Sequence, residues 1–201
     1  MLPKIVYFPT FLFNFPDRIY LEQSDDEINT YYVQVIQDIL DSCEDKLSVK
    51  KHIVDRIARL RAEHATAATF MSFLFGKDEK KQVDAVLQKA SNEMSRVIFG
   101  SWNQILGRNI AGKRVQIDWL LDPEKDNAPY LEIYIVDGQS KYGISERSLG
   151  FRWFFSFLLF TQFRINRKTS GGTIFLFDEP AANLHSKAQI KLLESFSRIA
   201  N

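Results

Sequence analysis

The sequence predicts an α/β fold that combines a helical hairpin or arm, a β-hairpin and a central strand flanked by helices. Three observations predict this fold. Apolar residues recur at helical spacing between Ile28 and Leu106, the period shortens to two at residues 114–121 and 130–137, and an apolar run fills Thr173–Phe177.

These patterns divide the chain into three parts. Residues 1–24 form a leading strand and loop, residues 25–110 a helical arm or helical subdomain, and residues 111–201 a C-terminal lobe. The leading strand is expected at Lys4–Phe8, which is β-branched and aromatic, and the prolines after it indicate a loop.

Two helical stretches occupy the second part. The polar cluster QSDDE marks the start of the first, with Ser24 or Asp25 as its N-cap, and helical spacing continues to Leu60. The second stretch runs from Val83 to Leu106. Together they predict a helical hairpin or short arm inserted between sheet elements, and two ordinary core helices fit the pattern equally well.

The third part begins with two alternating segments, RVQIDWLL and YLEIYIVD, around the turn-forming DPEKDNAP, which predict an antiparallel hairpin. The loop DGQSKYGISER leads to a phenylalanine-rich helix at 151–163. This helix contains Arg152 and falls short of the roughly 20 residues that span a membrane, so we expect a buried helix. The loop NRKTSGG then precedes strand 173–178, and an amphipathic helix follows at about 187–200.

Charge and cysteine content bound the function. Lys and Arg number 26 and Asp and Glu 25, so any binding to nucleic acid must come from a local patch. The single cysteine, Cys43, excludes an intrachain disulfide framework and suits a reducing cytoplasm. The first residues lack the charged and apolar regions of an export signal, and we expect a soluble cytoplasmic protein without a membrane segment.

The first motif that carries chemistry is the pair Asp178 and Glu179. Both carboxylates follow an all-apolar strand, which we expect to be a central strand covered on both faces, and ligands bind at the carboxyl ends of such strands. One carboxylate can hold Mg²⁺ through water while the other orients an attacking water, as phosphoryl transfer requires.

The second motif is ISERSLGFRWFF at 144–155. Ser148 and Gly150 stand where a helix begins, so free backbone amides and the helix dipole favour an anion there. Capping of the helix by Ser148 is the ordinary alternative.

The order and spacing of these motifs resemble the SMC-like and OLD-like ABC ATPases, a branch of the AAA family of ATPases, over roughly residues 144–190. The segment FLFDEP resembles the Walker B strand, which implies that Asp178 associates with Mg²⁺ and that Glu179 is the catalytic base. SERSLG resembles the signature motif, which implies that Ser148 and Gly150 contact the γ-phosphate of ATP held by the opposite subunit.

The resemblance extends to AANLH, which is similar to the D-loop that crosses the dimer interface and includes Asn183 and His185. The departure is a missing P-loop, because the sequence nowhere reads GxxxxGK followed by Ser or Thr. We therefore expect the C-terminal part of an ATPase core without its first lobe, unable to bind ATP tightly alone.

The resemblance implies an ATPase subunit of a DNA repair or antiphage defence system, with Mg²⁺ and ATP as cofactors. The expected partners are a second copy or higher oligomer, or a P-loop-bearing protein, with a nuclease effector and DNA as further possibilities. Two alternatives remain open. One is a non-catalytic interaction module that docks to a P-loop-bearing partner, and the other is a metal nuclease that adds Asp118, Glu132 and Asp137 to Asp178 and Glu179.

Several charged residues have ordinary explanations beside functional ones. His185 fits an interface or a helix cap, and His52 and His64 fit a solvated surface. Arg147 and Arg152 flank the signature segment and fit either a phosphate contact or a brace for the helix. The basic segment Lys46–His64 fits a solvated helix face better than a nucleic-acid contact, because acids interrupt it. No cysteine lies near a histidine at zinc-ligand spacing.

Overall fold

The computed structural model describes residues 4–8, 15–22, 24–43, 45–66, 70–106, 112–164, 173–178 and 184–199. Its helices are α1 (Glu27–Ser42), the π-helical η2 (Lys50–Val54), α2 (Asp55–Thr66), α3 (Phe70–Leu106), the 3₁₀ helix η3 (Pro123–Lys125), α4 (Leu149–Arg164) and α5 (Ser186–Ile199). Its strands are β1 (Lys4–Phe8), β2 (Ile19–Tyr20), β3 (Lys113–Asp122), β4 (Ala128–Asp137), β5 (Ser140–Gly143) and β6 (Thr173–Phe177). The mixed α/β fold class predicted from the sequence is confirmed.

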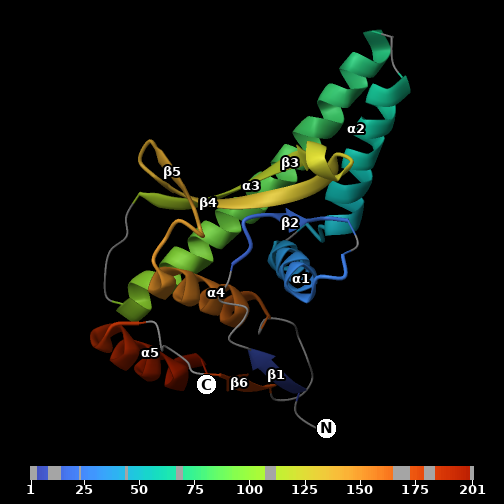
Figure 1. Ribbon diagram of the computed structural model, residues 1–201. Coiled ribbons are helices and arrows are strands. Elements are labelled where there is room, and N and C mark those ends of the chain that lie inside the picture. The colour runs from blue at the N-terminus through green and yellow to red at the C-terminus, as the bar shows by residue number, and fades with distance from the viewer. Residues whose placement is uncertain are drawn as a thin grey trace.

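The strands form two separate sheets. One is antiparallel in the order β2-β4-β3, with β5 also paired to β4, and the other is the parallel pair β1-β6. The hairpin α2-α3 projects away from the body, and β1 and β6 lie at the opposite end of the molecule (Figure 1). Among the described residues, no helix combines the length and the apolar character that crossing a bilayer requires.

The first predicted helical stretch is two helices rather than one. It breaks after Ser42, where Lys46 adopts a left-handed φ of 47°. Gln37 closes this loop because its side chain donates to Leu47 O at 3.0 Å and accepts from Val49 N at 2.9 Å. The N-cap of α1 is Asp26, one residue beyond the expected positions, and its carboxylate accepts from Ile28 N at 2.9 Å.

The structure therefore contains both a helical hairpin, formed by α2 and α3, and a core helix, α1. Helix α1 packs in the core with Tyr32, Ile36 and Ile39 at most 1% exposed, whereas α2 lies along the first part of α3. The second part of α3 contacts β3, α4 and α5. Helix α3 thus runs without interruption from the projecting hairpin to the body.

The predicted antiparallel hairpin is confirmed as β3 and β4, which pair from Lys113↔Asp137 to Asp122↔Ala128. Its connection follows the chemistry of DPEKDNAP. Asp122 caps η3 by accepting from Glu124 N at 3.0 Å, and Asp126 and Asn127 have φ values of 49° and 55°, which these residue types tolerate. Strands β2 and β5 lie in segments that the sequence indicates as loops.

Helix α4 forms the centre of the core, as its apolar composition predicts. Every residue from Trp153 to Phe160 is at most 2% exposed. The Ser156 hydroxyl meets the Tyr32 hydroxyl at 3.1 Å, so this polar group is paired inside the core.

The parallel pair β1-β6 is covered on one face only. Phe8 and Phe177 point into the core, where Phe8 lies 4.5 Å from Phe160 and Phe177 lies 5.5 Å from Phe157 between ring centroids. The opposite face exposes four apolar side chains, at 64%, 55%, 46% and 48%: Ile5, Tyr7, Ile174 and Leu176. The expectation that β6 is a central strand covered on both faces is wrong for the described residues, because nothing among them packs on this face.

Candidate functional site

The strand-exit motif begins at the carboxyl end of the parallel pair. Asp178 follows β6 directly, is exposed, and donates its backbone N–H to Phe8 O at 3.5 Å. Its carboxylate therefore stands where both parallel strands end, which is the position that α/β sheets use for ligands. Glu179 lies outside the described residues, as does Asn183 of the AANLH segment.

The signature-like segment enters α4 through a tight turn after β5. Glu146 N donates to Gly143 O at 3.3 Å and Arg147 N donates to Ile144 O at 3.1 Å. The Glu146 carboxylate accepts from Gly143 N at 2.8 Å, and Ile144 anchors the turn at 2% exposed. Backbone and side-chain bonds thus fix the residues that precede Ser148.

Ser148 caps α4 while its side chain stays exposed. Its hydroxyl oxygen accepts from Phe151 N at 3.3 Å, and its carbonyl accepts the first helical bond from Arg152 N at 3.0 Å. A hydroxyl that accepts a cap bond still carries a proton that it can donate to an anion. The ordinary capping role is present, and it is compatible with an anion contact.

Gly150 lies half-buried in the first turn of the same helix. The structure therefore brings Ser148 and Gly150 together where backbone N–H groups and the helix dipole favour negative charge. Asp178 belongs to a different element, at the end of β6. The two predicted motifs are thus placed on separate elements.

Two arginines flank this turn of helix. The Arg147 guanidinium carbon lies 5.0 Å from the Tyr142 ring centroid and 5.4 Å from that of Phe151. Arg152 is half-buried, and its Nε has no hydrogen-bond partner among the described residues. The role of Tyr142 could not be read from the sequence, because β5 was expected to be a loop.

Two histidine side chains of the described chain accept hydrogen bonds from nearby backbone N–H groups. The exposed His185 precedes α5, and its Nδ1 accepts from Ala188 N at 3.2 Å. His52 is half-buried and its Nδ1 accepts from Ser48 N at 2.9 Å, so this side chain is only partly solvated. The side chain of His64 lies outside the described part.

The basic segment Lys46–His64 directs its arginines at acids of the same chain. Arg61 meets Glu22 at 2.8 Å, and Arg59 meets Glu79 at 2.9 Å. Paired guanidinium groups have less charge to offer to phosphates, so this helix face is a solvated, ion-paired surface.

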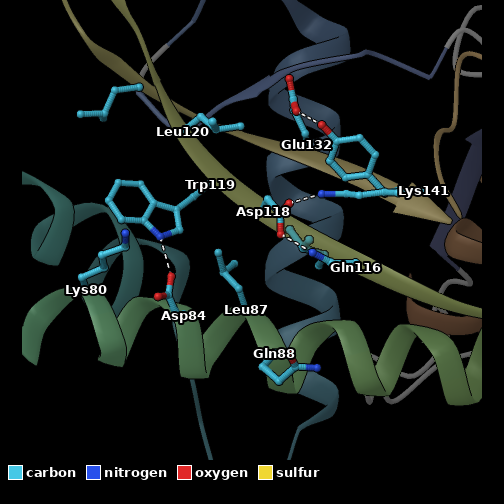
Figure 2. Close-up of a pocket in the computed structure, with 13 residues that line it drawn as sticks. Lys80, Asp84, Leu87, Gln88, Gln116, Asp118, Trp119, Leu120, Glu132 and Lys141 are labelled. Atoms are coloured by element: carbon cyan, nitrogen blue, oxygen red, sulfur yellow. Dashed lines mark hydrogen bonds and ion pairs between the residues drawn. The ribbon is translucent and has the colours of Figure 1, made fainter. Parts of the chain in front are cut away.

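A second candidate site is the groove of about 820 Å³ between α3 and the hairpin β3-β4. Figure 2 shows its polar side chains turned toward one another. The Trp119 indole N–H donates to Asp84 at 2.8 Å, Lys141 pairs with Asp118, and the Tyr134 hydroxyl donates to Glu132. Burial, followed by the bond to Glu132, raises the pKa of Tyr134, so this phenol stays protonated. The polar groups named here pair with one another, which leaves them little capacity to bind a ligand.

The carboxylates of the nuclease alternative do not converge either. Asp118 and Glu132 face each other across β3 and β4, whereas Asp178 ends a strand of the other sheet. Asp137 pairs with Lys113. In the portion of the chain described, no three His, Cys, Asp or Glu side chains are grouped so as to hold a metal ion.

A family model and a solved structure match nearly the whole chain. The AAA ATPase domain family matches residues 4–201. No curated protein matches the sequence. Among solved structures, the chain is similar to the Smc head domain with an extended coiled coil, bound to the C-terminal domain of ScpA, from Pyrococcus furiosus. That similarity has 14% identity and a TM-score of 0.42, and covers 98% of this chain and 52% of that one.

The present chain therefore spans about half the length of that Smc structure. The family match includes the segment from Ser148 to Gly150, the strand β6 and the carboxylate of Asp178. The chain belongs to the AAA ATPase domain family.

Proposed function

We propose that this chain supplies the signature and Walker B elements of an ABC-type ATPase that hydrolyses ATP across a subunit interface. One observation carries the proposal. The exposed Ser148 hydroxyl and Gly150 share the first turn of α4, which a short network of hydrogen bonds fixes in place. A preorganised set of donors at a helix start suits the γ-phosphate of a nucleotide bound by another subunit.

The Walker B part of the proposal concerns Mg²⁺. The exposed carboxylate of Asp178 is a hard oxygen ligand, which is the kind that Mg²⁺ prefers, directly or through water. When bound, Mg²⁺ would neutralise charge on the β- and γ-phosphates. In this proposal Asp178 holds the ion through water, and Glu179 takes the proton of the attacking water.

The phosphate cradle must come from outside this sequence, since the sequence contains no GxxxxGK[ST] motif. The exposed apolar face of Ile5, Tyr7, Ile174 and Leu176 supports a P-loop-bearing partner. Parallel sheets occur almost only with both faces covered, and a strand–P-loop–helix unit is a layer that would cover this one. We therefore propose that a P-loop-bearing lobe docks on this face of β1-β6, the strand pair that Asp178 directly follows.

Assembly and biological role extend the proposal further. The resemblance to SMC-like and OLD-like ATPases supports a homodimer or higher oligomer that works in a cytoplasmic DNA repair or antiphage defence system. Asn183 and His185 would then lie at the dimer interface, and hydrolysis would reset the hairpin α2-α3 or an attached nuclease effector on DNA.

A second candidate function is a non-catalytic module that docks to a P-loop-bearing partner without turnover. The same apolar face favours it, because docking through that face needs neither carboxylate. A metal nuclease has less support, because its candidate carboxylates lie on two sheets and Asp118 and Asp137 are paired with lysines.

The first experiment measures binding of Mg-ATP to the purified chain by calorimetry, beside Glu179→Gln. We expect neither protein to bind Mg-ATP with micromolar affinity, because no cradle holds the triphosphate. Hydrolysis is then measured after adding a P-loop-bearing first lobe. Turnover that disappears in Glu179→Gln but persists in Glu194→Gln, a change at an exposed acid on α5, supports the ATPase. Complex formation without turnover supports the docking module, and micromolar binding by the chain alone contradicts the half-site proposal.

A further inference from the structure

We propose that Arg147 is a further phosphate-contacting residue of the signature segment, and that Tyr142 positions its guanidinium. The proposal rests on the proposed function and adds to it a cation that acts on the nucleotide of the opposite subunit. Its ligand class is a di- or triphosphate.

The guanidinium is held by two aromatic rings from two elements. Its central carbon lies 5.0 Å from the ring centroid of Tyr142 on β5 and 5.4 Å from that of Phe151 in the first turn of α4. Aromatic faces attract a guanidinium without occupying its N–H donors, which lie in its plane. The rings thus hold the cation and leave its donors available.

The backbone of Arg147 is fixed as well. Its N–H donates to Ile144 O at 3.1 Å inside the turn that Ile144 anchors at 2% exposed. A side chain ordered before a ligand arrives loses less conformational entropy on binding. Arg147 is therefore preorganised next to Ser148.

The charge of Arg147 is not neutralised nearby. The nearest acid in sequence, Glu146, uses its carboxylate on Gly143 N at 2.8 Å. Five other arginines of the described chain pair with carboxylates: Arg18, Arg56, Arg59, Arg61 and Arg96. Arg147 has no such ion pair within the described residues. A planar cation without a carboxylate partner is suited to bidentate contact with a phosphate.

The surface around Arg147 is suited to closure by a partner. Leu149 is 57% exposed and Tyr142 is 36% exposed, so apolar area flanks the cation. Covering this area would exclude water, and an ionic contact strengthens when water is excluded. Arg147 thus stands at the centre of a surface that a nucleotide-bearing subunit would cover.

The first arm of the test does not need the proposed ATPase activity. Inorganic triphosphate is titrated into the ¹⁵N-labelled chain, and the Nε–H signals of arginines and the amides of residues 148–151 are followed by NMR. We expect saturable shifts at Arg147 and in the first turn of α4. Arg147→Gln should weaken binding by about tenfold or more. The matched control is Arg114→Gln, which removes an exposed arginine on β3 that lies in no ion pair and against no ring among the described residues, and it should bind as the parent does.

Tyr142 is tested in the same titration. Tyr142→Ser removes the ring and should weaken triphosphate binding several-fold, whereas Tyr142→Phe keeps the ring and should restore it. Thermal unfolding of each variant establishes that the fold is kept. Equal affinities for Arg147→Gln, Arg114→Gln and the parent, or shifts confined to other parts of the chain, overturn the proposal.

The second arm separates this proposal from the proposed function. Hydrolysis is measured with the P-loop-bearing lobe added, and Arg147→Gln is expected to lower kcat by about tenfold or more while Arg114→Gln does not. Triphosphate binding that needs Arg147, without turnover by any mixture, supports the Arg147 proposal and contradicts the ATPase. Turnover that needs Glu179 but is unchanged in Arg147→Gln contradicts the Arg147 proposal and leaves the ATPase standing.

Discussion

Asp122 lies at the end of β3 and fastens it to the segment before α1. Asp122 is only 3% exposed, and its carboxylate accepts hydrogen bonds from the Tyr20 hydroxyl at 2.7 Å and from Arg18 at 2.9 Å. The Tyr20 hydroxyl, then the bond from Glu124 N and the charge of Arg18, lower the pKa of Asp122 below its usual 3.8, against the effect of burial. The folded state therefore favours the ionised carboxylate.

This shift predicts an acid-dependent stability. Because the folded pKa lies below the unfolded one, the stabilisation is fully present above the unfolded pKa, about 3.9, and is lost as pH falls through the folded pKa. Asp122→Asn should lower Tm by a constant amount above about pH 5, and the gap should narrow as pH falls below about 4. Thermal unfolding from pH 2 to 7 measures it, with the exposed Glu124→Gln as control. A gap that stays constant to pH 2 contradicts the assignment.

Some individual residues of the candidate site could be predicted from the sequence. The Ser-x-Gly pattern identified a helix start, and Ser148 caps α4 as its residue type favours. The ring contacts of Arg147 were not predictable, because Tyr142 lies in a four-residue strand without an alternating pattern. Sequence spacing reports which residues share an element, but it does not report which side chains meet across elements.

Strand β3 has an outer edge that α3 covers with two serines. Ser95 accepts from Val115 N at 2.8 Å, and Ser91, one helical turn earlier, accepts from Ile117 N at 3.0 Å. The four residues from Ser91 to Ser95 rise about 6 Å along the helix, close to the rise of two residues of a strand, so the two repeats stay in step. The helix thus satisfies edge groups that would otherwise invite pairing with another chain.

Replacing one of these serines should show how much its hydrogen bond to β3 contributes to stability. Ser91 is 2% exposed, so Ser91→Ala leaves the buried Ile117 N–H without a partner and should cost about 1–3 kcal/mol. Urea unfolding measures the loss, and hydrogen exchange at Ile117 should accelerate. Ser101→Ala, on the same helix at a side chain that makes no hydrogen bond among the described residues, should change stability by less than about 0.5 kcal/mol. Equal effects of the two changes would contradict the edge-capping role.

Helices and strands with a regular pattern of apolar residues could be predicted from the sequence. Elements that depend on contacts with distant residues could not. The alternation of RVQIDWLL and YLEIYIVD located β3 and β4, and the apolar run located β6. Strand β2 has two residues and depends on Asn29, which bonds both the N–H and the carbonyl of Tyr20. A strand of two residues shows no alternation in the sequence. The Asn29 side chain that holds it lies on α1, so no local pattern around Tyr20 indicates the contact.

The whole molecule is asymmetric in how it covers its two sheets. Helix α3 packs on the antiparallel sheet and α4 fills the core, whereas β1-β6 exposes Ile5, Tyr7, Ile174 and Leu176. Burying the exposed half of each side chain would contribute about 1 kcal/mol, before the cost of association. Composition alone did not predict this face, because an all-apolar strand indicates cover without saying which polypeptide provides it.

The exposed face predicts how the purified chain behaves. We expect the parent chain to self-associate weakly through this face and to bind a hydrophobic dye there. The double variant Ile5→Lys with Leu176→Lys should remove the self-association and lower the dye fluorescence, without loss of stability. Sedimentation velocity over a concentration series measures the first effect. Leu193→Lys, at a residue 61% exposed on α5, is the matched control and should behave as the parent does. Self-association that persists in the double variant would assign it to another surface.

The continuous helix α3 also has a mechanical consequence. Its 37 residues span about 55 Å as one rod, with the serine contacts to β3 past its middle and the hairpin with α2 along its N-terminal part. A tilt of about 5° at the base displaces the far end by about 5 Å. A small rotation of the body would therefore move the distal end of α3 by several ångströms, and a load applied to that end would act on β3 and α4 through a long lever arm.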